Sequence, residues 1–464
     1  MLNYQLMKLS AKLFVFSALV LLSACGREFL EVKRSRGQVV PNSVEDFQAI
    51  LDRSQDMNRS SSHELSVIGA DEYYVADNQW ESLRDPYQKN GYIWNADVYE
   101  HQDVDDWNSA YFRILIANMV LEGAAGIVPS AAERAAWNNI RGSALFFRAW
   151  NHYQLAQLFC KPYDPQTAST EKGIPLRLES DVTLKIGRGS LESVYRQIIS
   201  DLHEASDLLP VEPANKMRPS KPAVLALLAR VFLMMGDYEQ AGQTANRCLE
   251  LTDELVDFNG LDLTNNQLFL LDYGATNPEM LFYSVMDNIT ITNTSRFHAD
   301  TTLLSMYEAG DLRAPGYFRD AGGGRMVFKA SYGGSVTFFT GMATDEVYLI
   351  ASECAVRNGN TADALHYLDA LLSKRYEPSL YQPVAITDPN ELLKVILRER
   401  RKELVLRGVR WEDLRRLNKD PEHATTLTRV VNGATHTLEP GSPRWVWPIP
   451  DKEVDIGDLP QNER

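Results

Sequence analysis

The stretch ELLKVILRERRKELVLRGVRWEDLRRL, residues 391–417, is the segment of the sequence that indicates the fold most clearly. Its apolar residues Leu393, Ile396 and Leu404 recur at helical spacing, and charged residues occupy the flanks of that stripe. Gly408 can adopt the left-handed backbone conformation that ends a helix. The stretch therefore predicts a long helix that closes at Gly408 and a short second helix after it, which together form a corner.

The run of six charges at residues 398–403 has mixed sign. Such a run on a helix usually forms a solvated or salt-bridged face, and we favour this interpretation over a nucleic-acid patch. The chain of 464 residues carries a net charge of −15, which argues against binding to polyanions. A neutral or basic ligand, or a neutral glycan, fits this acidic composition better.

The N-terminus has the pattern of a bacterial lipoprotein signal. Two lysines precede an apolar run at residues 13–22, which is too short to span a bilayer as a permanent helix. The run leads into Leu-Ser-Ala-Cys at residues 22–25, a lipobox whose cysteine is the site of lipidation. We therefore predict a signal peptide at residues 1–24, lipidation at Cys25 and an extended tether at residues 25–41. These features place the mature protein on a bacterial membrane surface.

Two segments have the pattern of a helix pair broken at a glycine. In each, a small alanine after the break allows the second helix to pack closely on the first, as in tetratricopeptide repeats. Further helices are expected from periodicity and capping residues. The pairs are residues 222–251, with Gly236 and Ala241, and residues 347–372, with Gly359 and Ala364; the further helices are residues 44–51, 106–123, 130–159 and 190–210.

Two other segments lack sustained periodicity and are rich in aromatic residues. Residues 71–107 combine tyrosine and tryptophan with Asp, Asn and Gln, and residues 253–344 combine aromatic residues with glycine-rich turns. We predict that both are irregular lobes carried by the helices.

Cysteine use gives no sign of a cross-linked or metal-stabilised fold. Apart from Cys25, the chain has Cys160, Cys248 and Cys354, an odd number without C-x-x-C spacing. This argues against a disulfide framework and against a zinc site. Cys248 and Cys354 fall within helical patterns, where we expect them to act as small buried hydrophobic residues.

Eight segments in chain order match the pattern of one protein family. They are the lipobox at Cys25, SALFFRAWNHYQLAQLF from Ser143, GIPLRLES from Gly173, SLESVYRQIISDLHEASDLLP from Ser190, RPSKPAVLALLARVFLMMGDYEQA from Arg218, EVYLIASECAVRNG from Glu346, the corner ERRKEL with RWEDLRRL, and WPIPDKEVDIGDLPQNE from Trp447. Together they resemble the SusD/RagB outer-membrane nutrient-binding lipoproteins of Bacteroidetes. The resemblance covers most of the chain after the lipobox.

This resemblance implies a mainly α-helical protein in which tetratricopeptide-like helix pairs support irregular, loop-rich ligand-binding lobes, with residues 42–464 as a single domain. Members of the family act as hinged lids on TonB-dependent SusC-like transporters and capture glycans, or in some relatives peptides, without catalysis. The implied partners are therefore such a transporter and a glycan or peptide. The implied location is the outer membrane, lipid-anchored and facing the cell exterior. Neither a catalytic residue nor a cofactor is expected.

Binding of a sugar requires aromatic faces for stacking and planar polar side chains for the hydroxyl groups. The lobe at residues 71–107 offers both. The alternative is that its rings anchor the lobe to the helices, because large aromatic side chains are mostly buried. The predicted stacking residues are Trp80, Tyr92 and Trp94, their predicted polar or secondary partners are Tyr73, Tyr74, Asn78 and Asn95, and the tryptophans assigned to the scaffold are Trp411, Trp445 and Trp447.

Two other functions stay open at this point. A surface glycosidase needs two carboxylates at a defined separation, but the 62 acidic residues indicate no particular pair, and G-x-S-x-G and H-E-x-x-H motifs are absent. A tetratricopeptide adaptor for a protein partner is compatible with the helix pairs, although the aromatic lobes weigh against it. Asp-Val-Asp-Asp at residues 103–106 could contact structural calcium, but no EF-hand loop surrounds it and a helix cap is the simpler role.

Overall fold

A computed structural model describes residues 41–464, and these residues are mainly helical, which confirms the predicted fold class. The predicted signal peptide, Cys25 and nearly all of the tether lie outside the described residues. The helices are α2 (Val44–Leu51), α3 (Ser54–Met57), α4 (Glu64–Gly69), α5 (Asp77–Glu81), α6 (Pro86–Tyr92), α7 (Asp105–Ala125), α8 (Arg134–Phe159), α9 (Leu191–Leu208), α10 (Lys221–Met235), α11 (Tyr238–Leu249), α12 (Thr301–Leu304), α13 (Arg313–Tyr317), α14 (Thr344–Arg357), α15 (Thr361–Leu372), α16 (Pro389–Glu403), α17 (Arg410–Leu417) and α18 (Asp451–Asp455).

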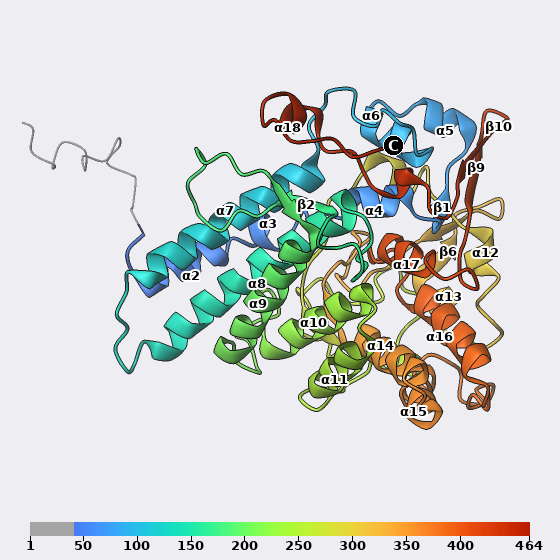
Figure 1. Ribbon diagram of the computed structural model, residues 1–464. Helices are drawn as coiled ribbons and strands as arrows, with labels where there is room; N and C mark the ends of the chain where they lie inside the picture. Colours follow the sequence, from blue (N-terminus) through green and yellow to red (C-terminus); the bar gives the residue numbers. More distant parts are fainter. Residues whose placement is uncertain (1–40) are drawn as a thin grey trace, which may run out of the picture. The chain divides into compact units, whose positions relative to one another are not determined.

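The long helices follow one another in a row in which each packs against the next (Figure 1). The row runs from α7 through α8, α9, α10 and α11 to α14, which contacts both α15 and α16. Residues Ser43–Arg464 form one compact unit that contains its own hydrophobic cores. The second half of α8 is buried on all sides, because helices and the C-terminal tail cover it; the Trp447 N–H donates to the Leu158 carbonyl (2.9 Å).

Two helix pairs have the tetratricopeptide-like arrangement that the sequence predicts. Gly236 ends α10 with φ of +79°, and Gly359 occupies the same place between α14 and α15 with φ of +82°. Glycine adopts this left-handed conformation without steric strain, so the chain reverses there. Ala241 and Ala364 are fully buried, which lets the second helix of each pair approach the first closely. Because α11 also packs on α14, the two pairs stack although they are distant in sequence.

The corner at residues 391–417 has an earlier boundary than predicted. Helix α16 ends at Glu403, and a turn follows in which Leu406 has φ of +56° and Gly408 has φ of +76°. The helix stops because the Leu406 N–H donates to the buried carboxylate of Glu72 (2.7 Å) instead of to a helical carbonyl. The second helix of the corner, α17, then begins as expected.

The charges of this corner are salt-bridged, as predicted, but Glu399, Arg400, Lys402 and Glu403 are buried rather than solvated. We call their ion pairs, together with the further pairs that their partners make, the corner ion network. An unpaired buried charge is strongly unfavourable, so these pairs hold α16 against α10, α14, α17 and the lobe at residues 253–344. The pairs are Arg400–Glu346 (3.2 Å), Arg400–Asp413 (2.8 Å), Arg230–Glu346 (2.5 Å), Lys402–Asp311 (2.7 Å), Arg313–Glu399 (2.5 Å), Arg313–Glu403 (3.0 Å), Arg375–Glu403 (2.8 Å) and Arg375–Glu279 (2.6 Å).

The strands of the described residues are short and form antiparallel pairs. The pair β1–β5 joins the two aromatic lobes, and β4–β8 joins the second lobe to the start of α14. The first lobe is less irregular than predicted, because it also contains α5 and α6. The pairs are β1 (Tyr73–Tyr74) with β5 (His298–Ala299), β2 (Lys172–Pro175) with β3 (Arg188–Ser190), β4 (Met280–Phe282) with β8 (Met342–Ala343), β6 (Phe318–Asp320) with β7 (Met326–Phe328), and β9 (Leu427–Val431) with β10 (Ala434–Leu438).

The tryptophans assigned to the scaffold are buried and lie together. The Trp411 ring centroid is 4.7 Å from that of Trp445 and 5.2 Å from that of Trp447. Cys248 and Cys354 are buried free thiols within α11 and α14, which confirms the role expected for them.

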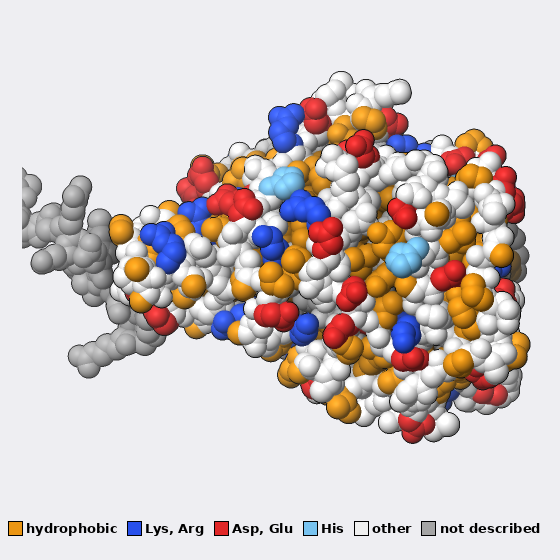
Figure 2. Space-filling view, turned by 90° about the horizontal axis from the view of Figure 1, so that it is seen from below, with side chains coloured by type: hydrophobic (Ala, Val, Ile, Leu, Met, Phe, Trp, Pro, Cys, Tyr) orange, Lys and Arg blue, Asp and Glu red, His pale blue; other side chains and the backbone are white. Residues whose placement is uncertain are grey.

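The face shown in Figure 2 has Lys and Arg side chains interspersed with Asp and Glu, and its apolar side chains are scattered. No single-sign patch of the kind that binds nucleic acid dominates this face. Within residues 41–464, no helix is both long enough and apolar enough to cross a membrane.

Candidate ligand-binding surface

Three of the predicted ligand-binding rings lie in the hydrophobic core. Tyr73, Tyr92 and Trp94 are 3%, 2% and 1% exposed. The guanidinium of Arg429, on β9, lies 3.8 Å from the centroid of the Tyr92 ring and 4.6 Å from that of Trp94. The prediction that these rings contact a ligand is therefore wrong, because an arginine from the C-terminal part of the chain packs on them and the surrounding core closes them off.

Tyr74 points the opposite way from Tyr73, since consecutive side chains of a strand lie on opposite faces. Its side chain is 43% exposed. One face of the Tyr74 ring stacks on His298, the residue that pairs with it on β5, with ring centroids 4.7 Å apart and planes inclined by 28°. Partial burial and the nearby Arg325 guanidinium lower the pKa of His298, so at neutral pH the imidazole is uncharged and offers one hydrogen-bond donor and one acceptor.

Helix α5 places further polar and aromatic groups on the same lobe. Trp80 is partly exposed; its Nε1–H donates to the Lys89 carbonyl (3.0 Å), and the Lys89 ammonium lies 4.7 Å from the ring centroid. Asn78 is exposed. Gln79 donates from Nε2 to the Ser295 carbonyl (2.8 Å), which ties α5 to the segment that leads into β5.

Two further arginines hold that segment in place, one from the β6–β7 hairpin and one from the segment itself. Arg325, just before β7, donates to the carbonyls of Thr294 (2.5 Å) and Phe297 (3.2 Å). Arg296 donates to the Ser82 hydroxyl just after α5 (3.3 Å). Hydrogen bonds thus hold β5, α5 and the β6–β7 hairpin together, so the side chains between these elements have defined positions.

We call this region the β1–β5 surface. The sequence predicts three of its members and misses four. Three of the missed residues lie in the second lobe and join the surface only through the packing of that lobe on the first, whereas Gln79 lies on α5 between two predicted members. The predicted members are Tyr74, Asn78 and Trp80, and the members that the structure adds are Gln79, Arg296, His298 and Arg325.

Asn95, which the sequence predicts as a polar or secondary partner of the ligand, is exposed and makes hydrogen bonds with neighbouring residues and with the end of the chain. Its main-chain oxygen accepts a hydrogen bond from Arg464 (2.8 Å), and its side-chain oxygen accepts from the adjacent Ala96 N–H (2.9 Å). Since no described contact links Asn95 to the β1–β5 surface, we do not include it there.

The aspartates considered for calcium make contacts within the protein. Asp103 pairs with Lys452 (2.6 Å). Asp106 is buried and accepts hydrogen bonds from the N–H groups of Glu64 (3.1 Å) and Leu65 (2.7 Å) at the start of α4. Across residues 41–464, no group of three or more His, Cys, Asp or Glu side chains is arranged to hold a metal ion.

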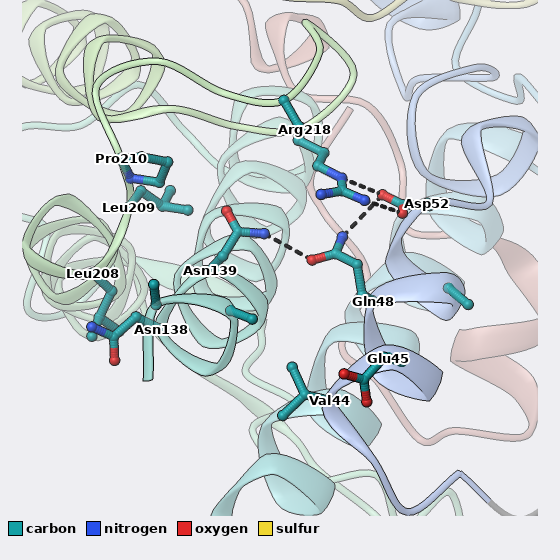
Figure 3. Close-up of a pocket in the computed structure, with 14 residues that line it drawn as sticks. Val44, Glu45, Gln48, Asp52, Asn138, Asn139, Leu208, Leu209, Pro210 and Arg218 are labelled. Carbon is teal, nitrogen blue, oxygen red and sulfur yellow. Dashed lines mark hydrogen bonds and ion pairs between the residues drawn. The ribbon is translucent and has the colours of Figure 1, made fainter. Parts of the chain in front are cut away.

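A cleft of about 620 Å³ lies between α2, the start of α8 and the end of α9 (Figure 3). Its polar side chains bind one another: Asn139 donates to Gln48 (2.8 Å), and Gln48 donates to Asp52 (2.9 Å). Arg218 also pairs with Asp52 (2.5 Å). No aromatic side chain lines this cleft. The β1–β5 surface is the better candidate for a sugar because it has exposed rings.

Two sequence families match this chain in order. A SusD-like family described as "Starch-binding associating with outer membrane" matches residues 28–233, and the SusD family matches residues 340–463. The chain belongs to the SusD/RagB family. The resemblance seen in the sequence is confirmed.

Individual relatives of this SusD/RagB protein agree with that assignment. SusD-like protein P2 of Formosa agariphila is 25% identical over 375 residues, which cover 67% of this chain and 71% of that protein. A SusD superfamily protein of Bacteroides vulgatus has a TM-score of 0.73 at 20% identity and covers 91% of this chain and 99% of its own. A SusD-like carbohydrate binding protein of the same organism has a TM-score of 0.68 at 19% identity, with 90% and 97% covered. These structures share the fold.

Proposed function

We propose that this SusD/RagB protein binds a glycan at the β1–β5 surface. The observation that carries the proposal is the Tyr74 ring, which is 43% exposed although one face rests on His298. Its remaining exposed surface is available to the C–H face of a sugar, and Asn78 on the same lobe supplies a planar polar side chain for hydroxyl groups. The starch-binding description of the matching family and the carbohydrate binding relative in Bacteroides vulgatus support this choice of ligand.

The construction of the surface also favours binding. The hydrogen bonds from Gln79 to Ser295 and from Arg296 to Ser82 hold α5 against the segment before β5. A site whose parts are already ordered loses less conformational entropy when a ligand arrives. The neutral state of His298 further avoids placing an unpaired charge beside an uncharged sugar.

Delivery to a transporter and anchoring to the membrane are the second part of the proposal. We infer that the lipid on Cys25 holds the protein on the outer face of the outer membrane, where it acts as the lid of a TonB-dependent SusC-like transporter. Membership of the SusD/RagB family, the outer-membrane description of the matching family and the lipobox at residues 22–25 support this role. In this role the protein captures its ligand and does not cleave it.

Isothermal titration tests the binding role. Because Ser43–Arg464 is compact by itself, the protein can be made without its first 25 residues and titrated with plant, host and microbial oligosaccharides. Saturable binding of one glycan class, with intact glycan recovered afterwards, is the expected result. Cleaved product would contradict the proposal and show that the protein is a surface glycosidase. An absence of binding across the panel would also contradict it and would indicate a peptide or protein partner instead of a glycan.

Purification from membranes tests the delivery role. We expect the tagged full chain, extracted in mild detergent, to co-purify with an outer-membrane protein that mass spectrometry identifies as TonB-dependent. Cys25→Ala is the control for anchoring, and it should move the protein from the membrane to the soluble fraction. Recovery of the full chain without any such transporter would contradict the lid role.

A further inference from the structure

A second cleft, of about 450 Å³, lies where β2, the end of α17 and the C-terminal tail meet. We call it the tail cleft. It is not part of the β1–β5 surface. The side chains that matter for its chemistry are Lys172, Arg188, Arg415, Asn418, Lys419 and Trp445.

Arg415 gives the tail cleft its unusual property. It is 3% exposed, and its two terminal nitrogens donate to the carbonyls of Gln157 and Cys160 at the end of α8. Its Nε–H has no hydrogen-bond partner among the described residues, and none of their carboxylates forms an ion pair with it. A buried cation without a counter-ion is costly, so the protein has reason to accept a negative group beside it.

Two other buried arginines, Arg375 and Arg429, show two ways in which a buried guanidinium is compensated. Arg375, in the corner ion network, has carboxylate partners, with Glu279 at 2.6 Å and Glu403 at 2.8 Å. Arg429 has no carboxylate partner among the described residues, but aromatic rings pack on its guanidinium. Arg415 has neither an ion pair nor a packed ring among the described residues, the charge of Glu412 acts on it only from beyond ion-pair distance, and it lines an open cleft.

Neighbouring groups extend this donor-rich lining. Asn418 accepts from the Thr425 N–H (2.8 Å) through Oδ1, while its Nδ2 is buried and has no partner among residues 41–464. The exposed side chain of Lys172 has no ion-pair partner in the same residues. Lys419 donates to the Tyr163 carbonyl (2.9 Å) and is also paired with Asp164 (3.7 Å), outside the lining.

Acidic groups in the lining do not balance the cations. Glu171 is paired with Lys161 (3.0 Å), which also lines the cleft, and Glu463 is the other acidic residue there. The lining thus carries five basic and two acidic side chains, in a protein whose net charge is −15. Such a local reversal of sign attracts an anion to this place and not to the surrounding surface.

We propose that the tail cleft binds a sugar acid, a hydroxylated ring that carries a carboxylate. The carboxylate pairs with the exposed Lys172 ammonium on the side of the cleft that Arg415 lines, and the ring hydroxyls lie beside the Asn418 amide. Trp445 and Pro443 provide apolar lining for the carbon face of the ring. The volume falls within the range of roughly 300–1,000 Å³ that is usual for small-molecule sites. This inference stands independently of the β1–β5 surface.

Titration with galacturonic acid, galactose and inorganic sulfate tests the inference. We expect galacturonic acid to bind, galactose to bind at least about tenfold more weakly because it lacks the carboxylate, and sulfate to bind more weakly because it lacks the ring. Lys172→Gln and Asn418→Leu should each lower the affinity for galacturonic acid by about three- to tenfold. Lys394→Gln, an exposed lysine outside the cleft, is the matched control and should leave affinity unchanged.

Each of the alternative results would contradict a different part of the proposal. Equal affinity for galactose would show that the unpaired cation plays no part, and equal affinity for sulfate would show a general anion site instead of a sugar-acid site. Unchanged binding in Lys172→Gln and Asn418→Leu would place the ligand elsewhere. Retention of galacturonic acid binding by Tyr74→Ala is expected, whereas its loss in that variant would assign the ligand to the β1–β5 surface.

Discussion

The guanidinium carbon of Arg429 lies 3.8 Å from the centroid of the Tyr92 ring, and this contact covers a ring of the first aromatic lobe. Arg429 also donates to the carbonyls of Ile68, Ala70 and Tyr92. One side chain therefore caps three main-chain acceptors and fills the space beside the rings. The lobe is closed by the protein itself.

Replacement of this arginine should loosen the lobe. We expect Arg429→Ala to lower the free energy of unfolding by about 2–4 kcal/mol, because it removes a cation–π contact and leaves buried carbonyls without a donor. Urea denaturation followed by circular dichroism measures the change. Val430→Ala, at the exposed neighbouring position, is the control and should have little effect. Equal effects of the two substitutions would contradict the role given to Arg429.

The corner ion network should be intolerant of losing one member. Arg375→Met removes a buried cation that pairs with Glu279 and Glu403, and we expect it to destabilise the protein by about 3–5 kcal/mol. Lys374→Met is a matched control one residue away, where the exposed pair with Asp257 (3.3 Å) contributes at most about 1 kcal/mol. Denaturation of the two variants under the same conditions gives the comparison. A small effect of Arg375→Met would show that the network is not needed for stability.

Stability should fall between pH 4.5 and pH 7 partly because of Glu412. Burial raises the pKa of this glutamate from 4.5 to about 7, so the folded state holds a proton that the unfolded state has released. The penalty is absent below pH 4.5 and complete above about pH 7. We expect the effect of Glu412→Gln on the free energy of unfolding, relative to the wild type, to be more favourable at pH 8 than at pH 5 by about 2–3 kcal/mol.

Glu353 provides the opposite case and a control. Burial alone would raise its pKa, but the Arg416 guanidinium and its hydrogen bonds hold the pKa at about 2. Its stabilising contribution is therefore present throughout pH 5–8 and is lost only in acid. Glu353→Gln should be destabilised equally at pH 5 and pH 8. If the changes in free energy of unfolding caused by Glu412→Gln and Glu353→Gln depended on pH in the same way, the raised pKa of Glu412 would be refuted.

The glycine that ends α10 should resist substitution for a backbone reason. A Cβ at Gly236 would meet no atom within 4 Å, yet its φ of +79° is unfavourable for other residues. We expect Gly236→Ala to cost about 1–2 kcal/mol and Gly236→Asn to cost less, because asparagine tolerates the left-handed conformation better. Gly187→Ala is the control, since Gly187 has open space and lacks a positive φ. A neutral Gly236→Ala would contradict this explanation.

The helical scaffold could be predicted because its signals are local. A glycine five residues before an alanine marks both helix pairs, and the structure places Gly236 and Gly359 at the reversals and buries the alanines. The corner was predictable as two helices for the same reason. Its early end at Glu403 was not, because the group that binds the Leu406 N–H is Glu72, which is 334 residues away.

The β1–β5 surface was predictable only in part. Strand alternation separates Tyr73 from Tyr74, but two residues are too few for a periodic pattern to show which ring faces the core. Tyr92 and Trp94 are closed by Arg429, whose separation from Tyr92 is 337 residues. His298 enters the surface through a two-residue strand pair. Long-range packing of this kind leaves no local trace in the sequence.

Titration of the preferred oligosaccharide into wild-type protein, Tyr74→Ala and Tyr273→Ala tests the central claim most directly. Tyr273 is a matched control because it is 37% exposed and lies on a different turn, beside Arg59. We predict that Tyr74→Ala weakens binding at least about tenfold, equivalent to about 1.4 kcal/mol, while Tyr273→Ala binds like the wild type. Undiminished binding by a folded Tyr74→Ala variant would contradict the proposal that the glycan binds at the β1–β5 surface.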